Sequence, residues 1–73
     1  MIEWVPYNDH TIKACSQSLV EARWLPLALI LKSVGNQELL TTVNGDSTEI
    51  CKSCKEADRV ALRKATRWID QNR

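Results

Sequence analysis

Apolar residues recur with helical spacing near the end of the chain. At 100° per residue, one line collects Cys54, Ala57, Ala61, Ala65 and Trp68, with Val60, Leu62 and Ile69 on its flanks. Ser53 and Glu56 stand three residues apart at the start of this run, which is the spacing of a capping box. No Gly or Pro interrupts the pattern. The pattern therefore predicts one long amphipathic helix over residues 53–72.

Upstream of this helix, two segments have the pattern of a β-hairpin. Residues 24–32 are apolar almost throughout, which is typical of a strand with both faces covered. Pro26 cannot donate a hydrogen bond to a ladder, so we expect it near the start of that strand, at an edge or a bulge. Residues 33–37 contain a Gly and predict the hairpin loop. The second strand is expected over residues 38–43.

A further strand is expected over residues 10–16, with a short helix over residues 16–23 as the alternative. Residues 1–9 are expected to form a loose lead-in with a turn at its end. The elements together predict an α+β fold, in which a three-stranded antiparallel sheet packs on one long C-terminal helix. At 73 residues the chain is expected to be a single domain over residues 1–73.

The predicted hairpin leaves one face of the sheet without cover. If Lys32 pairs with Glu38, the leucine-rich face of the hairpin is the better partner for the helix. The opposite face then carries an apolar patch made of Trp24, Ala28, Ile30 and Leu40. A monomer rarely leaves such a patch in water, so the sequence predicts a homodimer with this patch at its interface. The alternative is that residues 1–9 fold back over the patch.

Composition and charge set limits on the class of protein. The net charge is +1, but residues 1–50 carry −3 and residues 51–73 carry +4, so the positive charge gathers on the helix. Three Cys without a visible signal peptide favour free thiols and a cytoplasmic protein. The longest apolar run, residues 25–31, is too short to span a bilayer, so no membrane association is expected.

The cysteines offer the chain's candidates for a metal or redox site. Cys51 and Cys54 form a C-x-x-C at the predicted helix start. With Cys15 and His10 they could supply a Cys3His zinc set, although the spacing is not diagnostic. Amides at a helix N-terminus lower a thiol pKa, which would favour a redox pair. The interpretation we favour is that these residues are structural, with no metal and no cofactor.

A line of basic residues lies on the exposed side of the predicted helix. It consists of Lys55, Arg59, Arg63 and Arg67. Guanidinium groups repeated at this spacing could contact phosphates or an acidic partner. Acidic neighbours interrupt the line, and a pI of about 7.7 is below that of most nucleic-acid binders. We therefore expect a solvated face, and we keep a nucleic-acid-associated regulator as the alternative function.

The order of elements has a family resemblance. Tyr7 and Ile12 precede a strand that begins at Trp24, and the helix closes on Trp68-Ile69-Asp70. Over residues 7–70 this layout resembles small bacterial proteins of uncharacterised function with β-β-β-α order. The resemblance implies the fold and attaches no activity. The layout is also similar to the sheet and last helix of a double-stranded-RNA-binding domain, but the first helix of that domain is missing, so RNA binding is not implied.

Catalytic patterns are weak in this sequence. No Ser lies in a G-x-S-x-G turn, and two Gly are too few for the known phosphate-binding loops. The expected function is therefore a non-enzymatic module for assembly or protein interaction, with a second copy or another protein as its partner.

Overall fold

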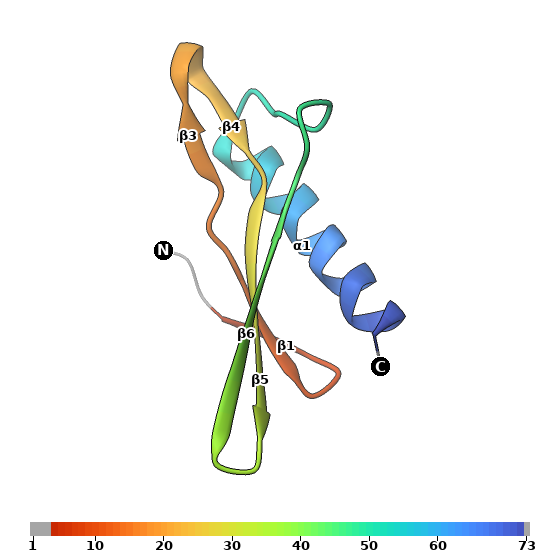
Figure 1. Cartoon of the computed structure of the whole chain (residues 1–73). Helices are drawn as coiled ribbons and strands as arrows, with labels where there is room; N and C mark the ends of the chain where they lie inside the picture. Colours follow the sequence, from red (N-terminus) through yellow and green to blue (C-terminus); the bar gives the residue numbers. More distant parts are fainter. Residues whose placement is uncertain (1–3, 73) are drawn as a thin grey trace.

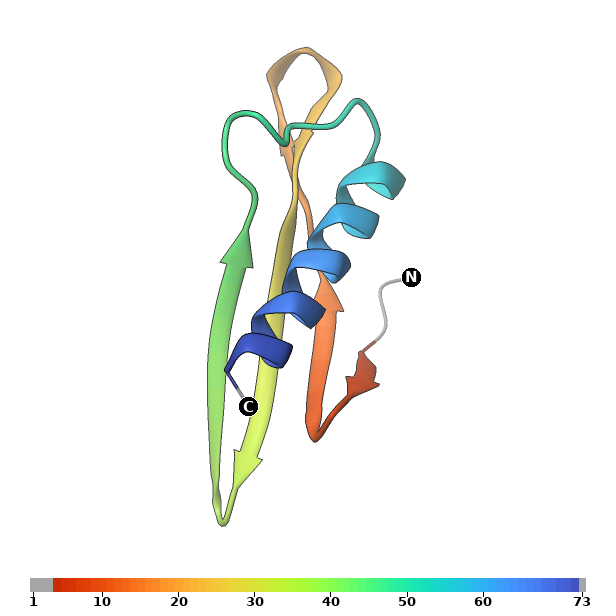
Figure 2. The ribbon, with the colours of Figure 1, turned by 90° about the vertical axis from the view of Figure 1, so that its right-hand side faces the viewer.

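The protein is an α+β molecule in which one helix crosses one face of an antiparallel sheet (Figures 1 and 2). A computed structural model describes residues 4–72 of the chain. The sheet is seen nearly edge-on in Figure 1, with the helix on one side of it. The elements in chain order are β1 (Val5–Tyr7), β2 (His10–Ala14), β3 (Gln17–Leu19), the 3-10 turn η1 (Val20–Ala22), β4 (Arg23–Leu25), β5 (Leu27–Val34), β6 (Gln37–Asn44) and α1 (Cys54–Gln71).

The predicted number of strands is wrong, although the α+β class is confirmed. Four strands form the main sheet in the order β1-β2-β5-β6, and β3 pairs with β4 in a separate two-stranded sheet. The extra strand of the main sheet, β1, comes from the segment expected to be a lead-in. It pairs with β2 through a tight turn in which Asn8 and Asp9 have φ of 46° and 66°. Asn and Asp tolerate this left-handed conformation better than most residues, which explains the turn.

The two small strands continue the ribbon formed by β2 and β5. Ala14 pairs with Ala28, and Gln17 pairs with Leu25, so both sheets share one register. The ladder is interrupted where Ser16 would face Pro26, because proline has no N–H to donate. Pro26 thus interrupts the predicted strand near its start, as expected. The alternative helix over residues 16–23 is wrong, since this segment forms β3 and the tip of the ribbon.

The β5–β6 hairpin has a different register from the predicted one. Lys32 pairs with Leu39, and Ser33 pairs with Glu38. The connecting loop is only Gly35 and its neighbour, with Gly35 at φ 61°, where a side chain would be strained. The prediction used a five-residue loop instead of this two-residue one. An error of one residue in register moves every side chain of β6 to the other face of the sheet, so Leu40 lies beside Leu31 and not beside Ile30.

The hydrophobic core lies between α1 and the central strands. Its buried members are Ile12, Ala28 and Ile30 from the sheet and Ala61, Ala65 and Ile69 from the helix. Alanine side chains on both sides bring the helix axis close to the sheet. Tyr7, Val43, Leu62 and Trp68 pack around this cluster and are partly buried.

The predicted helix is confirmed within one residue at each end. It spans Cys54–Gln71, and the Ser53 Oγ accepts a hydrogen bond from the Glu56 N–H at 3.2 Å. This bond satisfies one of the amide groups that a helix start leaves without a partner. The alanine stripe is buried as expected, but Ile69 rather than Trp68 closes its C-terminal end.

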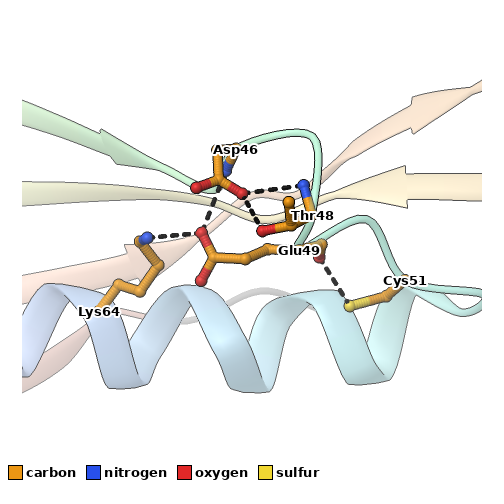
Figure 3. A network of polar contacts seen from close by, with 5 residues as sticks. All are labelled: Asp46, Thr48, Glu49, Cys51 and Lys64. Carbon is orange, nitrogen blue, oxygen red and sulfur yellow. Dashed lines mark hydrogen bonds and ion pairs between the residues drawn. The ribbon is translucent and has the colours of Figure 1, made fainter.

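The connection from β6 to α1 is fixed by its own polar side chains (Figure 3). Asp46 accepts hydrogen bonds from the backbone N–H and the hydroxyl of Thr48. Glu49 accepts from the Asp46 N–H at 3.1 Å and from Lys64 Nζ at 2.6 Å. Gly45 is buried at the start of this loop, where a Cβ would come within 3.1 Å of Pro26 Cγ. The loop is therefore anchored to the helix through Lys64 and to Pro26, just before β5.

Candidate protein-interaction surface

The face of the sheet opposite α1 carries a row of leucines. Because strand side chains alternate, and Ala28 and Ile30 lie under the helix, the intervening residues of β5 project from the other side. On β6, Leu40 pairs with Leu31 and so lies on the same side. This surface, here called the leucine face, consists of Leu27, Leu29, Leu31 and Leu40.

The surroundings of the leucine face are mostly uncharged. By the same alternation, the neighbouring positions of β2, β5 and β6 on this side are Thr11, Lys13, Ser33, Glu38, Thr42 and Asn44. Only two of these are charged, and their signs are opposite. At the margin the Trp4 ring is 42% exposed, with Lys13 Nζ 5.7 Å from its centroid, a cation–π distance. Leu40 is 60% exposed, whereas Leu27, Leu29 and Leu31 are partly buried, so a partner can reach the face most directly at Leu40.

The predicted patch is wrong in its central members. Ala28 is 0% exposed and Ile30 is 1% exposed, and both belong to the core beneath α1. Trp24 is half-buried at the end of the ribbon, where its backbone exchanges hydrogen bonds with Cys51. Only Leu40 of the predicted patch is exposed on the open face. The reason is that α1 packs on the side of β5 that carries Ala28 and Ile30, and not on the leucine side as predicted. The register error explains only why Leu40 was grouped with Ile30 instead of Leu31.

The alternative in which residues 1–9 cover the open face also differs from the structure. Val5–Tyr7 lie in the plane of the sheet as its edge strand β1. The tip of this strand is tied to the end of the helix, because the Tyr7 hydroxyl lies 3.0 Å from both carboxylate oxygens of Asp70. Residues 1–3 lie outside the described residues. Within residues 4–9 the chain widens the sheet and leaves the leucine face open.

The basic residues predicted on the helix are exposed as expected. Lys55, Arg59, Arg63 and Arg67 all lie on the solvent side of α1. Arg63 and Arg67 also line an open hollow of about 620 Å³ beside the helix, together with Glu49, Val60, Lys64, Thr66, Trp68, Asp70 and Gln71. Three basic and two acidic side chains share this hollow.

One of the acidic side chains in the hollow is already paired. The hydrogen bond from Lys64 holds the pKa of Glu49 below its usual value, and the Asp46 N–H adds to this effect. A lowered carboxyl pKa means that the contact stabilises the fold above the ordinary carboxyl pKa. That contribution is lost as pH falls through the lowered value. The ion pair therefore neutralises part of the basic character of the hollow.

The candidate zinc ligands are not brought together. Among residues 4–72 there is no group of three or more His, Cys, Asp or Glu arranged to hold a metal ion. All three cysteines are free, and Cys51 Sγ donates to the Glu49 carbonyl at 3.3 Å. His10 is buried in β2, with Nδ1 2.7 Å from the Asn8 carbonyl, which only accepts, so this nitrogen carries the proton.

The environment of Cys54 disfavours a reactive thiolate. Partial burial raises the pKa of its thiol, and the charge and hydrogen bonding of Asp58 raise it further. The thiolate is the reactive form, so this shift opposes the lowering that a helix N-terminus could give. The geometry therefore supports a structural role for Cys54.

Asp58 has a role that sequence reasoning missed. Its Oδ1 accepts the Ser16 N–H at 3.2 Å, and its Oδ2 lies 3.7 Å from Cys54 Sγ. The aspartate thus joins the start of α1 to the point where Pro26 interrupts the ribbon. Nearby, the Ser16 Oγ is buried without a hydrogen-bond partner among the described residues. A carboxylate on the apolar side of the helix was the available signal, but its partner lies 42 residues away.

Comparison with protein-family models, with curated proteins and with solved structures gave no match for this chain. The resemblance to small bacterial proteins therefore stays a prediction. None of the helices among the described residues is long and apolar enough to cross a membrane. The surfaces described above are thus the basis for any assignment of function.

Proposed function

We propose that this protein is a non-enzymatic assembly module that forms a homodimer through the leucine face. The observation that carries the proposal is the row formed by Leu27, Leu29 and Leu31 along β5, extended by Leu40, on the side of the sheet that α1 leaves open. Contiguous apolar surface of this kind marks interaction sites in soluble proteins.

A second copy is the partner that best fits this surface. A two-fold contact must be self-complementary, because each surface patch meets an identical one. On β2, β5 and β6 the charged groups on this side are Lys13 and Glu38, and these have opposite signs, so two copies can pair them across the interface.

The non-enzymatic part of the proposal is supported by the state of the reactive side chains. The single histidine is buried and bonded to a backbone carbonyl. The Cys54 thiol has a raised pKa, which lowers its reactivity at neutral pH. The free state of all three cysteines fits a reducing compartment, and we propose the cytoplasm.

The test is the mass in solution of the wild-type chain and of a charged variant of the face. Sedimentation equilibrium at micromolar concentration is expected to give twice 8.3 kDa for the wild type. Leu29→Lys places a charge in the centre of the face and is expected to reduce the mass to that of one chain. Gln71→Lys, which adds the same charge on the exposed side of α1, serves as the matched control and is expected to stay dimeric.

The basic side of α1 supports a second candidate function, a nucleic-acid-associated regulator. The favouring observation is that Arg63 and Arg67 line one hollow beside Trp68. Phosphate contacts weaken as salt rises, so binding of a duplex or single strand below about 10 μM must be salt-dependent. The double variant Arg63→Gln, Arg67→Gln is expected to lose such binding. Equal binding by wild type and variant would exclude this function.

A further inference from the structure

The edge of the sheet formed by β6 lacks the features that usually keep an edge strand from pairing with another chain. Within the described residues β6 is hydrogen-bonded to β5 alone, so its other edge is open over eight residues. Natural edge strands are commonly protected by lysine, proline, a bulge or short length. The opposite edge, β1, is three residues long and contains Pro6. The sequence of β6 contains neither Lys nor Pro, and Glu38 is its one charged residue.

Two backbone hydrogen bonds determine which groups of β6 point outward. Gly45 N donates to Pro26 O at 2.9 Å, in line with the β5–β6 register. Bonded pairs alternate with non-bonded ones along an antiparallel ladder, so Val43, Thr41 and Leu39 direct their backbone groups toward β5. The hydrogen bond from Cys15 N to Leu27 O shows that Leu27 directs its backbone groups away from β6, so Ala28 directs its own toward Val43 of β6, which gives the same alternation. The backbone groups that remain for a partner belong to Glu38, Leu40, Thr42 and Asn44.

We infer that β6 pairs antiparallel with β6 of a second copy, about a two-fold axis at Thr41. In this register Leu40 of each copy is a bonded partner of Thr42 of the other, and Glu38 is a bonded partner of Asn44. The four-stranded sheets of the two copies join into one continuous sheet. This contact goes beyond the face-to-face dimer proposed above, because it uses the backbone of a different element.

The residues of β6 favour this register over its neighbours. The free backbone N–H and C=O groups of one copy must meet those of the other, so the nearest alternative registers place the two-fold axis at Leu40 or at Thr42. Each of these registers leaves one end of the strand without a partner. Centring on Thr41 pairs every residue from Glu38 to Asn44. The carboxylate of Glu38 meets an amide instead of its own copy, which avoids a like-charge pair. On the helix side Leu39, 53% exposed, gains a cross-strand neighbour in the partner's partly buried Val43.

Most of β6 stays exposed beside α1. The buried residues that the helix covers come from β2 and β5, and β6 reaches this core through the partly buried Val43, whereas Leu39, Leu40 and Thr42 are exposed. On the open side, Thr42 pairs with Leu29 within one chain, and Leu40 pairs with Leu31. Joining the edges therefore sets Leu31 and Leu40 of one copy in line with Thr42 and Leu29 of the other. The leucine faces of the two copies become one surface.

The inference is tested by disulfide crosslinking of Thr41→Cys. Residue 41 would face its own copy as a non-bonded pair, with Cα atoms about 4.5 Å apart, within the range that a disulfide spans. Its side chain points to the helix side, so the face-to-face dimer cannot bring two copies of it together. Gln37→Cys is the matched control, because the same register places its two copies about 27 Å apart.

Under mild oxidation Thr41→Cys is expected to give at least tenfold more covalent dimer than Gln37→Cys or the wild type. The wild type controls for crosslinking through Cys15, Cys51 and Cys54. Equal amounts of dimer in the three proteins would overturn the inference, with circular dichroism showing that each is folded.

Two additional backgrounds separate the edge contact from the face-to-face dimer. Crosslinking uses protein concentrations well above the micromolar range of the sedimentation test, and oxidation traps an edge contact that is too weak to hold two copies together in that test. Adding Leu29→Lys is therefore expected to leave the Thr41→Cys crosslink in place, whereas its loss would show that the edge contact does not form on its own and would overturn the inference. Adding Thr42→Pro removes an outward N–H and keeps the bonds to β5, so it is expected to reduce the crosslink at least fivefold. An unchanged crosslink in folded Thr42→Pro protein would contradict the proposed ladder.

Discussion

The two faces of the main sheet are both apolar, but they differ in the size of their side chains. The face under α1 presents Ala28 next to the cross-strand pair of Ile12 and Ile30, and the helix meets it with alanines, so the two layers pack closely. The open face presents leucines at alternate positions of β5, which are partly exposed because α1 lies on the other face. Small residues, more than total hydrophobicity, therefore identify the face on which the helix packs.

The largest expected difference in stability is between two variants, each of which shortens one side chain of β5 on one face of the sheet. Ile30→Ala removes a buried side chain and leaves a cavity under α1, so we expect a loss of about 2–5 kcal/mol in the free energy of unfolding. Leu29→Ala, at the next position on the open face, is expected to cost the isolated chain about 1 kcal/mol or less. Urea titrations at low protein concentration measure both. Equal losses would contradict the assignment of the faces.

The two faces are also expected to differ in how they tolerate a larger side chain. Ala61 is 1% exposed between helix and sheet, so Ala61→Leu is expected to force the layers apart at a cost of about 1–3 kcal/mol. Thr42→Leu adds volume on the open face, where it meets no helix, and we expect no loss of stability. Thermal unfolding compares the two variants, and tolerance of Ala61→Leu would show that the helix is not closely packed.

Removing the N-cap of α1 is expected to change the free energy of unfolding by less than the changes in the core. Ser53→Ala removes the hydroxyl that accepts the Glu56 N–H, and we expect a loss of about 1 kcal/mol. Ser33→Ala, on the exposed end of β5, is the matched control without a helix to cap. Chemical unfolding of the two variants checks this prediction. Equal stability would mean that the cap contributes nothing measurable.

The smallest expected effect concerns thiol chemistry at the same end of the helix. Asp58→Asn removes the negative charge beside Cys54, so the raised pKa of the thiol is expected to fall, although partial burial still raises it. The midpoint of the pH profile for alkylation of Cys54 should move to lower pH, with the modified residue identified by mass spectrometry. Asp70→Asn, at the other end of α1, should leave the profile unchanged. A profile unaffected by Asp58→Asn would rule out the contact.

Local patterns in the sequence predicted much of the fold. The helix could be predicted because its spacing and its Ser53 cap depend only on nearby residues. The strand that follows Pro26 and the strand after Gly35 could be predicted for the same reason. The tip of the ribbon could not, because Glu21 and Ala22 take positive φ without the Gly or Asn that usually signals such a turn.

The interaction surface was harder to predict than the elements that form it. Its location depends on which face of β5 the helix covers, and the prediction assigned the helix to the leucine side. The side on which Leu40 lies depends also on the β5–β6 register, which the length of the Gly35 loop decides. The prediction of an uncovered apolar face agrees with the structure, but Ala28 and Ile30 were taken from the covered face. The contact of Asp58 with Ser16 joins distant parts of the chain and has no local signal.

The most direct test of the account is an isotope-filtered NOESY experiment on a mixture of labelled and unlabelled copies. If the leucine face is an interface between copies, intermolecular contacts will connect the methyl groups of Leu27, Leu29, Leu31 and Leu40. The methyl groups of Ala57, Ala61 and Ala65 will show contacts within one chain only, because the helix already buries them. Intermolecular contacts at the alanines, or none at the leucines in a protein of dimer mass, would contradict the account.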